Sequence, residues 1–309
     1  MQPLPMRFSL RARDGHGFNG LYTDCSMNKF VLKTIALLVL VSGWYGPTLA
    51  GAYVLRGPHV LELMTRELRY PQHLLVHQRQ FIFDTSDEGR VIELNEVVRY
   101  FLPGYFRSDI QTDNVERIYV ASKNQALAVV DGQIAETATT RFDRYKDIFL
   151  FQNRKHLEKH LTDLGVDITV TSLGRLEDRI AYVLGAQYPD TLPTQVWIDK
   201  ETFRPMRWMQ ATHDSDGQLD IFDIRYHDWR PVDKAWYPGR IDFYHNTVLV
   251  REIIVEGIAK DAGFGYELFD IERLRASYPI AQPLNQEPTE SEELREVHET
   301  IEEFKKKYE

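Results

Sequence analysis

Cysteine is almost absent from this chain of 309 residues, which contains a single one, Cys25. One thiol cannot form a disulfide within the chain, and it cannot supply a cysteine framework for a structural zinc ion. Cys25 also lies upstream of a segment that we expect to be cleaved off, so the mature chain is predicted to contain no thiol. Disulfides, thiol nucleophiles and an N-terminal lipidated cysteine are therefore not expected.

Signatures of catalysis and nucleotide binding are missing as well. The sequence has no Gly-x-Ser-x-Gly elbow, no phosphate-binding Gly-Lys-Ser/Thr loop and no dinucleotide fingerprint. His156 and His160 lie four residues apart on an expected helix, but the zinc-protease motif needs glutamate directly after the first histidine, where Leu157 stands. We therefore expect solvated histidines, no metal, no cofactor and no enzyme activity. A hydrolase built on Asp223 and His227 is the alternative, which turnover of ester substrates would reveal.

Positive charge is in the minority. The chain has 46 acidic and 37 basic residues and a net charge of −9. Residues 1–50 hold five basic and two acidic residues, so their removal would make the excess of negative charge larger. Apart from the final Lys305-Lys306-Lys307 run, no basic cluster offsets it. An acidic surface repels the phosphate backbone, so nucleic acid is not expected as a partner.

Long apolar runs are scarce, and the one near the N-terminus, from about Ile35 to Val41, is too short to span a bilayer. Lysines precede it, and Thr48-Leu49-Ala50 follows a turn-forming stretch. This order is typical of a secretory signal peptide, and we predict cleavage after Ala50; a retained membrane anchor is the alternative. Because residues 1–26 precede a complete signal, Met27 is predicted to be the true start.

Strand patterns dominate the rest of the sequence. Helices are expected at residues 58–69, where apolar side chains recur at helical spacing, and between residues 145 and 164. Segments rich in β-branched and aromatic residues predict strands at 74–84, 89–103, 115–122 and 125–132. From residue 167 to about 270 strands follow one another without a helix, which predicts consecutive antiparallel pairing. About eleven strands cannot form a flat sheet, so we expect an α+β fold with a strongly curved antiparallel sheet.

Alternation in the later strands places apolar side chains on one face of this sheet. Side chains of this kind are Val196 and Ile198, Met206 and Trp208, Phe222, Ile224 and Tyr226, and Ile241 and Phe243. Two interpretations are open at this point. The face belongs either to an ordinary packed core or to a cavity lined for an apolar ligand, since so large a sheet has more inner face than two helices readily fill.

The hairpin VWIDKETFRPMRW, residues 196–208, resembles one that recurs in the LolA/LolB-like superfamily of periplasmic lipoprotein carriers, to which the MucB/RseB sensors are related. The likeness lies in the Asp-Lys-x-Thr turn and in the Pro-x-Arg opening of the second strand. A second stretch, LPGYFRSD at residues 102–109, is similar to a Pro-Gly-x-Phe-Arg stretch of that group. Over residues 55–275 the resemblance implies an incomplete β-barrel of about eleven strands, with helices as a lid over an apolar cavity.

The resemblance also implies a function, that of a soluble periplasmic carrier in outer-membrane lipoprotein sorting. Its cargo would be lipid or lipoprotein acyl chains, received from an inner-membrane release complex and passed to an outer-membrane acceptor. Arg107 corresponds to an arginine near the cavity mouth of such carriers, which implies a role in lid control or cargo handling; the alternative is an exposed arginine at the end of a strand. The residues expected to contact the ligand are Arg107, Val196, Ile198, Met206, Trp208, Phe222, Ile224, Tyr226, Ile241 and Phe243.

The C-terminal segment differs from the rest in being charged and helical. Thr289 and Glu292 form a capping-box pattern, and a narrow apolar seam follows. The seam consists of Leu294, Val297, Ile301 and Phe304. It docks on its own domain, remains solvated, or binds a protein partner. The last interpretation makes the protein a non-enzymatic lipid-sensing or assembly factor. The expected organisation is an upstream segment (1–26), a signal peptide (27–50), the half-barrel domain (51–278), and a linker with the charged amphipathic helix (279–309).

Overall fold

The computed structural model describes residues 54–84, 89–112, 115–122, 125–213, 217–260 and 262–281. By its contacts the chain divides into two units, Met1–Tyr53 and Val54–Glu309, and every described residue belongs to the second. The expected upstream segment, the signal peptide with its cleavage after Ala50, and the C-terminal seam all lie outside the described residues.

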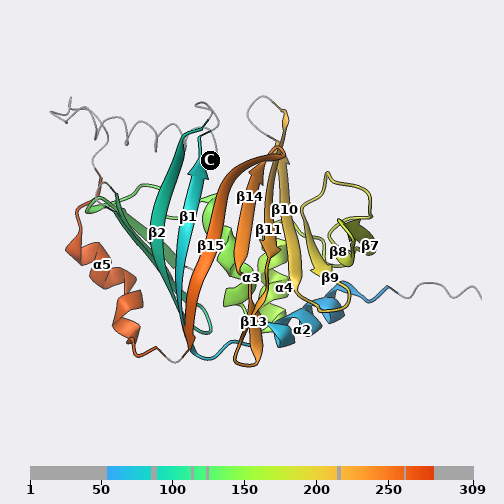
Figure 1. Ribbon diagram of the computed structural model, residues 1–309, viewed down its shortest axis with the longest axis horizontal. Coiled ribbons are helices and arrows are strands. Elements are labelled where there is room, and N and C mark those ends of the chain that lie inside the picture. Colours follow the sequence, from blue (N-terminus) through green and yellow to red (C-terminus); the bar gives the residue numbers. More distant parts are fainter. Residues whose placement is uncertain are drawn as a thin grey trace, which may run out of the picture. The chain divides into compact units, whose positions relative to one another are not determined.

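One large antiparallel sheet of thirteen strands organises the fold (Figure 1). The sheet is strongly curved and does not close, because β6 and β7 lie at its two edges. The expected α+β class with a curved, incomplete barrel is confirmed, with thirteen strands where about eleven were expected. The spatial order is β6-β5-β4-β3-β2-β1-β15-β14-β11-β10-β9-β8-β7.

The strands and their bounds are, in chain order, β1 (His73–Phe83), β2 (Val91–Phe101), β3 (Tyr105–Gln111), β4 (Glu116–Ser122), β5 (Gln125–Val130), β6 (Gln133–Ile134), β7 (Thr171–Leu176), β8 (Arg179–Leu184), β9 (Gln195–Asp199), β10 (Pro205–His213), β11 (Leu219–His227), β12 (Arg230–Val232), β13 (Ala235–Tyr237), β14 (Arg240–His245) and β15 (Val248–Lys260). Strands β12 and β13 form a separate two-stranded ribbon. Strand β3 contains part of the LPGYFRSD stretch and lies between the strands expected at 89–103 and 115–122.

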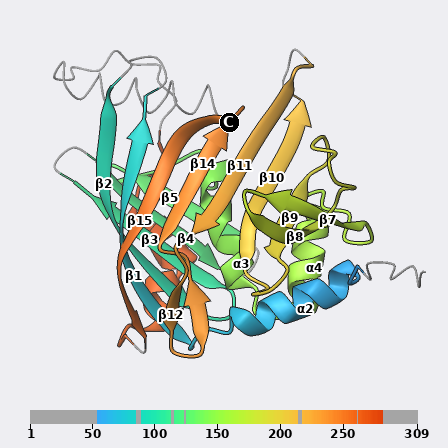
Figure 2. The same cartoon turned by 45° about the vertical axis from the view of Figure 1, so that its right-hand side comes forward.

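The first and last strands of the large sheet are neighbours near its centre. Strand β1 pairs with β2 on one side and with β15 on the other. From β1 the chain builds one arm by successive hairpins out to β6, and from β7 it builds the other arm back to β15. The chain must therefore cross between the two edges, and it does so over the concave face of the sheet (Figure 2).

The crossing segment contains three short helical pieces, where the sequence analysis expected one helix. The pieces are η1, a 3₁₀ helix (Arg141–Lys146), α3 (Asp147–Leu150) and α4 (Arg154–Asp163). Helix α4 confirms the helix expected between residues 145 and 164, and the extended backbone at Phe151 separates it from α3. Asn153 then starts a new helix, since its side-chain oxygen accepts a hydrogen bond from the Lys155 amide at 2.9 Å.

The other helices flank the sheet. They are α2 (Gly57–Glu67), a 3₁₀ helix η2 (Tyr266–Phe269) and α5 (Ile271–Ser277). Helix α2 confirms the amphipathic helix expected near its start. Gly57 permits a close approach, because a Cβ atom there would lie 2.2 Å from the carbonyl oxygen of Ile168. Within the described part of the chain, no helix combines the length and apolar character needed to cross a bilayer.

The two faces of the sheet carry separate apolar clusters. Helices α2, η1, α3 and α4 cover the concave face, where they share one extensive core with the sheet. On the convex face, η2 and α5 cover β4 and β5 in a smaller cluster. That second cluster contains Ile118, Val120, Leu127, Val129, Ile134, Phe269 and Ile271. A functional site for an apolar ligand therefore belongs to the concave face, between the sheet and the crossing segment.

Candidate ligand-binding interior

An apolar wall lies on the concave face of β9, β10, β11 and β14. Eight of the ten residues expected to contact a ligand belong to it, and none of their side chains is more than 4% exposed. They are Val196, Ile198, Trp208, Phe222, Ile224, Tyr226, Ile241 and Phe243. Strand alternation thus brings these residues together as expected, while their contact with a ligand stays a prediction.

Met206 lies away from this wall. In the β9–β10 hairpin Pro205 stands opposite Ile198 and Arg207 opposite Trp197, so Met206 is the extra residue of a bulge. It packs with Trp197 in a different cluster from that of Trp208. The expectation that Met206 and Trp208 share a face is wrong, because simple alternation does not reveal a bulge.

Arg107 is also separated from the wall. Its neighbours Phe106 and Ser108 are buried with the concave-face residues, so alternation directs Arg107 to the convex face. There its Nε donates hydrogen bonds to Asp109 at 2.9 Å, and its Nη1 donates to the carbonyl oxygen of Leu268 in η2 at 2.9 Å. The structure therefore places Arg107 beneath the C-terminal helices, and its proposed role in cargo handling stays a prediction.

The segment Arg141–Leu150, here called the plug segment, covers the apolar wall with its own aromatic rings. The ring of Phe142 lies 5.0 Å from that of Phe222 and 5.6 Å from that of Phe243. Further along, the ring of Phe149 lies 5.6 Å from that of Tyr226. In this structure the plug segment thus occupies the position in which an apolar ligand would meet the wall.

Next to the wall, the concave face becomes polar. Glu96, only 3% exposed, accepts hydrogen bonds from the side-chain amides of Gln78 and Gln80 and from the hydroxyl of Ser108. Burying a carboxylate is costly unless donors saturate it, and here three neutral donors surround it. The amide of Gln78 also contacts the Tyr145 hydroxyl at 3.2 Å, which links this polar patch to the plug segment.

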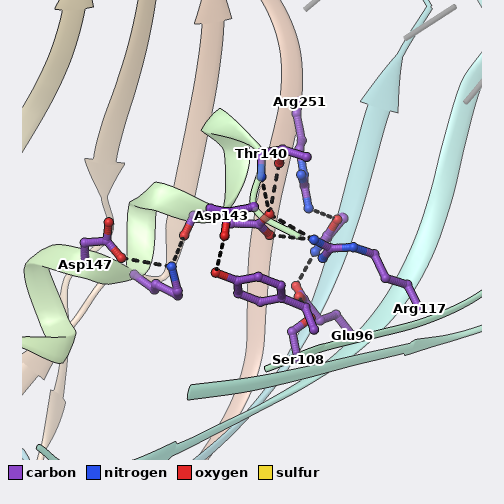
Figure 3. A network of polar contacts seen from close by, with 11 residues as sticks. Glu96, Ser108, Arg117, Thr140, Asp143, Asp147 and Arg251 are labelled. Carbon is purple, nitrogen blue, oxygen red and sulfur yellow. Dashed lines mark hydrogen bonds and ion pairs between the residues drawn. The ribbon is translucent and has the colours of Figure 1, made fainter. Parts of the chain in front are cut away.

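An ionic cluster holds the plug segment to the sheet, as Figure 3 shows. Arg117 of β4 donates through Nη2 to both carboxylate oxygens of Asp143, at 3.0 and 2.9 Å. The Thr140 amide donates to the same carboxylate at 2.9 Å, so Asp143 also caps the start of η1. Burial works to raise the pKa of Asp143, but the charges of Arg117 and Lys146 outweigh it and hold that pKa below its usual value.

Lys146 and Asp147 extend the cluster toward α4. The Lys146 ammonium, 3% exposed, donates to the carbonyl oxygen of Asp143 at 2.8 Å and to the Asp147 carboxylate at 2.9 Å. Burial opposes its charge, but the Asp147 carboxylate prevails and raises the Lys146 pKa. The other Asp147 oxygen lies 2.9 Å from Nε2 of His160. His160 is therefore a partly buried partner of Asp147, and only His156 is exposed as expected for both histidines.

Arg251 stands where the apolar wall meets the polar patch. Its guanidinium lies over the rings of Phe142 and Phe243, at 5.2 and 5.5 Å, and donates to the side-chain oxygen of Gln80. Burial lowers the pKa of Arg251, although Glu96 nearby acts in the opposite direction. Within the described residues, its buried Nε has no hydrogen-bond acceptor. The interior thus holds an N–H donor that the described residues leave without an acceptor.

This polar interior was not predicted from the sequence, although a signal for it exists. Gln78 and Gln80 fall at the inward positions of β1, in step with the buried Leu74 and Val76. In the same way, Arg251 is in step with buried apolar residues of β15. Polar residues at inward positions of an apolar strand indicate a site or a buried network, and this pattern could have been read directly from the sequence.

The alternative hydrolase residues do not come together. Asp223 accepts hydrogen bonds from Arg207 at 2.8 Å and from Arg225 at 3.0 Å, whereas His227 pairs with Asp242 at 3.2 Å. Each thus has its own separate partners on the convex face. Among the described residues, no group of three or more histidine, cysteine or acidic side chains is placed to hold a metal ion.

Comparison with known proteins gives similarity of structure only. No family model and no curated protein matches the sequence. A putative outer membrane lipoprotein-sorting protein domain from Vibrio parahaemolyticus aligns over 71% of this chain and 98% of its own, with 12% identity and a TM-score of 0.48. A LolA superfamily protein from Nitrosomonas europaea aligns over 71% and 99%, with 15% identity and a TM-score of 0.47. The complex of MucA and MucB from Pseudomonas aeruginosa aligns over 75% and 67%, with 13% identity and a TM-score of 0.21.

Proposed function

We propose that the protein is a non-enzymatic carrier that binds lipid, or the acyl chains of lipoproteins, on the concave face of its half-barrel. The observation that carries this proposal is the pairing of a four-strand apolar wall with a short plug segment. The plug segment meets the wall mainly through aromatic side chains, and acyl chains offer the wall the same kind of apolar surface.

The apolar contribution to the free energy favours such an exchange. Each CH₂ group buried contributes about 0.8 kcal/mol, so a long acyl chain contributes roughly 10 kcal/mol. Returning Phe142, Tyr145 and Phe149 to water costs roughly 1.5–3 kcal/mol for each side chain. Cargo that replaces these rings therefore stabilises an open arrangement of the plug segment, and release follows when the rings return.

The cellular role that we propose is lipoprotein sorting to the outer membrane. The carrier would act in the periplasm after cleavage behind Ala50, receive cargo from an inner-membrane release complex and deliver it to an outer-membrane acceptor. Support for this role comes from the order of features at residues 27–50 and from the resemblance of the hairpin at residues 196–208.

A second candidate is a lipid-sensing or assembly factor that acts through a protein partner. The sequence pattern of Leu294, Val297, Ile301 and Phe304 favours it, because it predicts a charged helix with one narrow apolar stripe, which would be suited to docking. Deleting residues 286–309 separates the two functions. A carrier retains lipid binding after the deletion, whereas a partner-dependent factor loses its partner.

The carrier proposal is tested on the full chain, purified without detergent from the soluble fraction of the cells that make it. Its organic extract is examined by mass spectrometry, and uptake of a neutral environment-sensitive dye is titrated by fluorescence. We expect lipid in the extract, and we expect Phe149→Ala to raise dye uptake by opening space against the wall.

The matched control is Phe269→Ala, which removes an equally buried ring from the convex-face cluster. It should lower stability in the same way without raising dye uptake. An empty extract, together with no dye uptake by either the wild-type protein or Phe149→Ala, would overturn the carrier proposal.

A further inference from the structure

Both the sheet and the plug segment supply charges that face the interior. In its polar part these are Arg117, Arg251 and Glu96 from the sheet and Asp143, Lys146 and Asp147 from the plug segment. Elsewhere Arg141 and Arg144 of the plug segment contact Asp220 at 2.9 Å and Gln210 at 2.7 Å. Glu96 is already saturated by neutral donors, so it does not depend on the plug segment for its partners. Asp143 is different, because it provides both of its oxygens to a sheet arginine.

Movement of the plug segment would therefore change the charge of the interior. Asp143 would leave with it, and Arg117 would lose the carboxylate that it contacts at 2.9 Å. Around Arg117 and Arg251 the sheet would be left with two guanidiniums and one saturated carboxylate, a local excess of one positive charge, while Asp220 would lose Arg141 but keep its contact with His245. A buried guanidinium without a counter-ion is costly, so the open interior requires an anion from another source.

Two adjacent residues of the plug segment have the arrangement of an anionic head group attached to an apolar chain. Phe142 and Asp143 are adjacent residues; the ring of the first lies against Phe222 and Phe243, and the carboxylate of the second meets Arg117. Arg251 spans the border between them, over the Phe142 ring and with its buried Nε unused. An apolar group followed directly by an anionic head thus already occupies the interior.

We infer that Phe142 and Asp143 occupy the places of the chain and head group of the cargo, and that the cargo is an amphiphile with a carboxylate or phosphate head. This inference rests on the carrier function proposed above and specifies its ligand class. The head group takes the position of the Asp143 carboxylate between Arg117 and Arg251. The chain takes the position of the Phe142 ring on the apolar wall.

The experiment compares three ligands with the same twelve-carbon chain below their micelle-forming concentrations: dodecanoate, dodecyl phosphate and dodecanol. Affinities for the full chain are measured by displacement of the neutral dye. We expect both anionic ligands to bind at least about tenfold more tightly than dodecanol, as charge-assisted hydrogen bonds predict. Acetate and inorganic phosphate lack the chain that displaces Phe142, so neither should displace the dye.

Two variants test the arginines separately, in case one of them does not fold. Arg117→Gln and Arg251→Gln should each reduce the preference for dodecanoate over dodecanol several-fold, with circular dichroism used to establish folding. Arg99→Gln is the matched control, since it breaks an arginine–aspartate pair on the convex face and should leave the preference unchanged. Asp143→Asn removes the competing carboxylate and should tighten dodecanoate binding while keeping its preference over dodecanol.

The outcomes separate this inference from the carrier function. If dodecanol binds as tightly as dodecanoate, the head-group assignment is overturned while the carrier function stands. The same holds if the preference survives in the arginine variants that fold. If inorganic phosphate alone displaces the dye, the site binds a free anion and the assignment to an amphiphile fails. If none of the three chain ligands binds, both the inference and the carrier function are rejected.

Discussion

Lys146 shows how closely single residues are matched in the interior. Its ammonium is enclosed by the Asp143 carbonyl oxygen, the Asp147 carboxylate and the rings of Phe106 and Tyr119, which lie 5.5 and 5.2 Å away. A buried ammonium group needs a counter-ion and acceptors for its N–H donors. This position supplies both, together with the faces of two aromatic rings. The plug segment is therefore fixed by polar contacts as well as by its rings.

Replacing Lys146 by methionine should destabilise the protein by about 3 kcal/mol, because the Asp147 carboxylate would lose its buried counter-ion. Urea unfolding measures the loss. The double variant Lys146→Met with Asp147→Asn should recover part of it, since no unpaired charge then remains. Lys159→Met, in an exposed pair with Asp163, serves as control and should change stability little. If Lys146→Met and Lys159→Met lowered the free energy of unfolding equally, the result would contradict a buried ion pair between Lys146 and Asp147.

Acid stability should depend on Asp143 and Asp147, because neighbouring cations hold their folded-state pKa values below the usual value of an aspartate. A carboxyl with a lowered folded pKa contributes stability above its unfolded pKa and loses it as the pH falls through the folded value. The free energy of unfolding should therefore decrease below about pH 4. Asp143→Asn should show a shallower decrease, measured by urea unfolding across that range. An unchanged slope would mean that Asp143 is not held in its charged form.

At the scale of elements, the β7–β9 part of the sheet depends on close packing around one tryptophan. Trp197 lies on the convex face, where its ring crosses Gly174 of β7. A Cβ atom on Gly174 would lie 2.9 Å from that ring and 2.8 Å from Val183. The glycine is thus required by the approach of a neighbouring side chain, and the three strands form one packed unit.

The prediction for this unit compares two strand glycines. Gly174→Ala should destabilise the protein by about 1–3 kcal/mol, because the added methyl displaces the Trp197 ring. Gly257→Ala in β15, where a Cβ atom would meet no atom within 4 Å, should be neutral or slightly stabilising. Thermal unfolding compares the pair, and similar losses in both would argue against the packing of Trp197 over Gly174.

Helices and strands with regularly spaced apolar residues could be predicted from the sequence. Features that depend on a single irregular residue could not. Helix α2 and strand β1 have regular apolar spacing, and both appear within a residue or two of their expected bounds. The break between α3 and α4 depends on one extended residue, Phe151, which no periodicity reveals. Met206 was misplaced for the same reason, because a bulge shifts the face of a single residue.

For the molecule as a whole, the sequence predicted the curved sheet but not the content of its interior. Consecutive strands without helices lead to hairpins, and the number of strands requires curvature. The pairing of β1 with β15 joins segments far apart in the chain, and no local pattern specifies it. The apolar wall could be predicted from the alternation of apolar residues. The polar patch beside it could be predicted only from Glu96 and Arg251, which are polar residues at inward positions of otherwise apolar strands.

The pairing of β1 with β15 also determines the order in which a newly made chain can fold. The arm from β1 to β6 can form its hairpins early, but the partner of β1 on the other side is the last strand of the sheet to be synthesised. Until it arrives, β1 presents an edge of eleven residues with unpaired backbone groups, which favours pairing with other chains. A nascent chain of this protein therefore passes through an aggregation-prone stage that ends only when residues 248–260 have emerged, and a holding chaperone would be most useful during that interval.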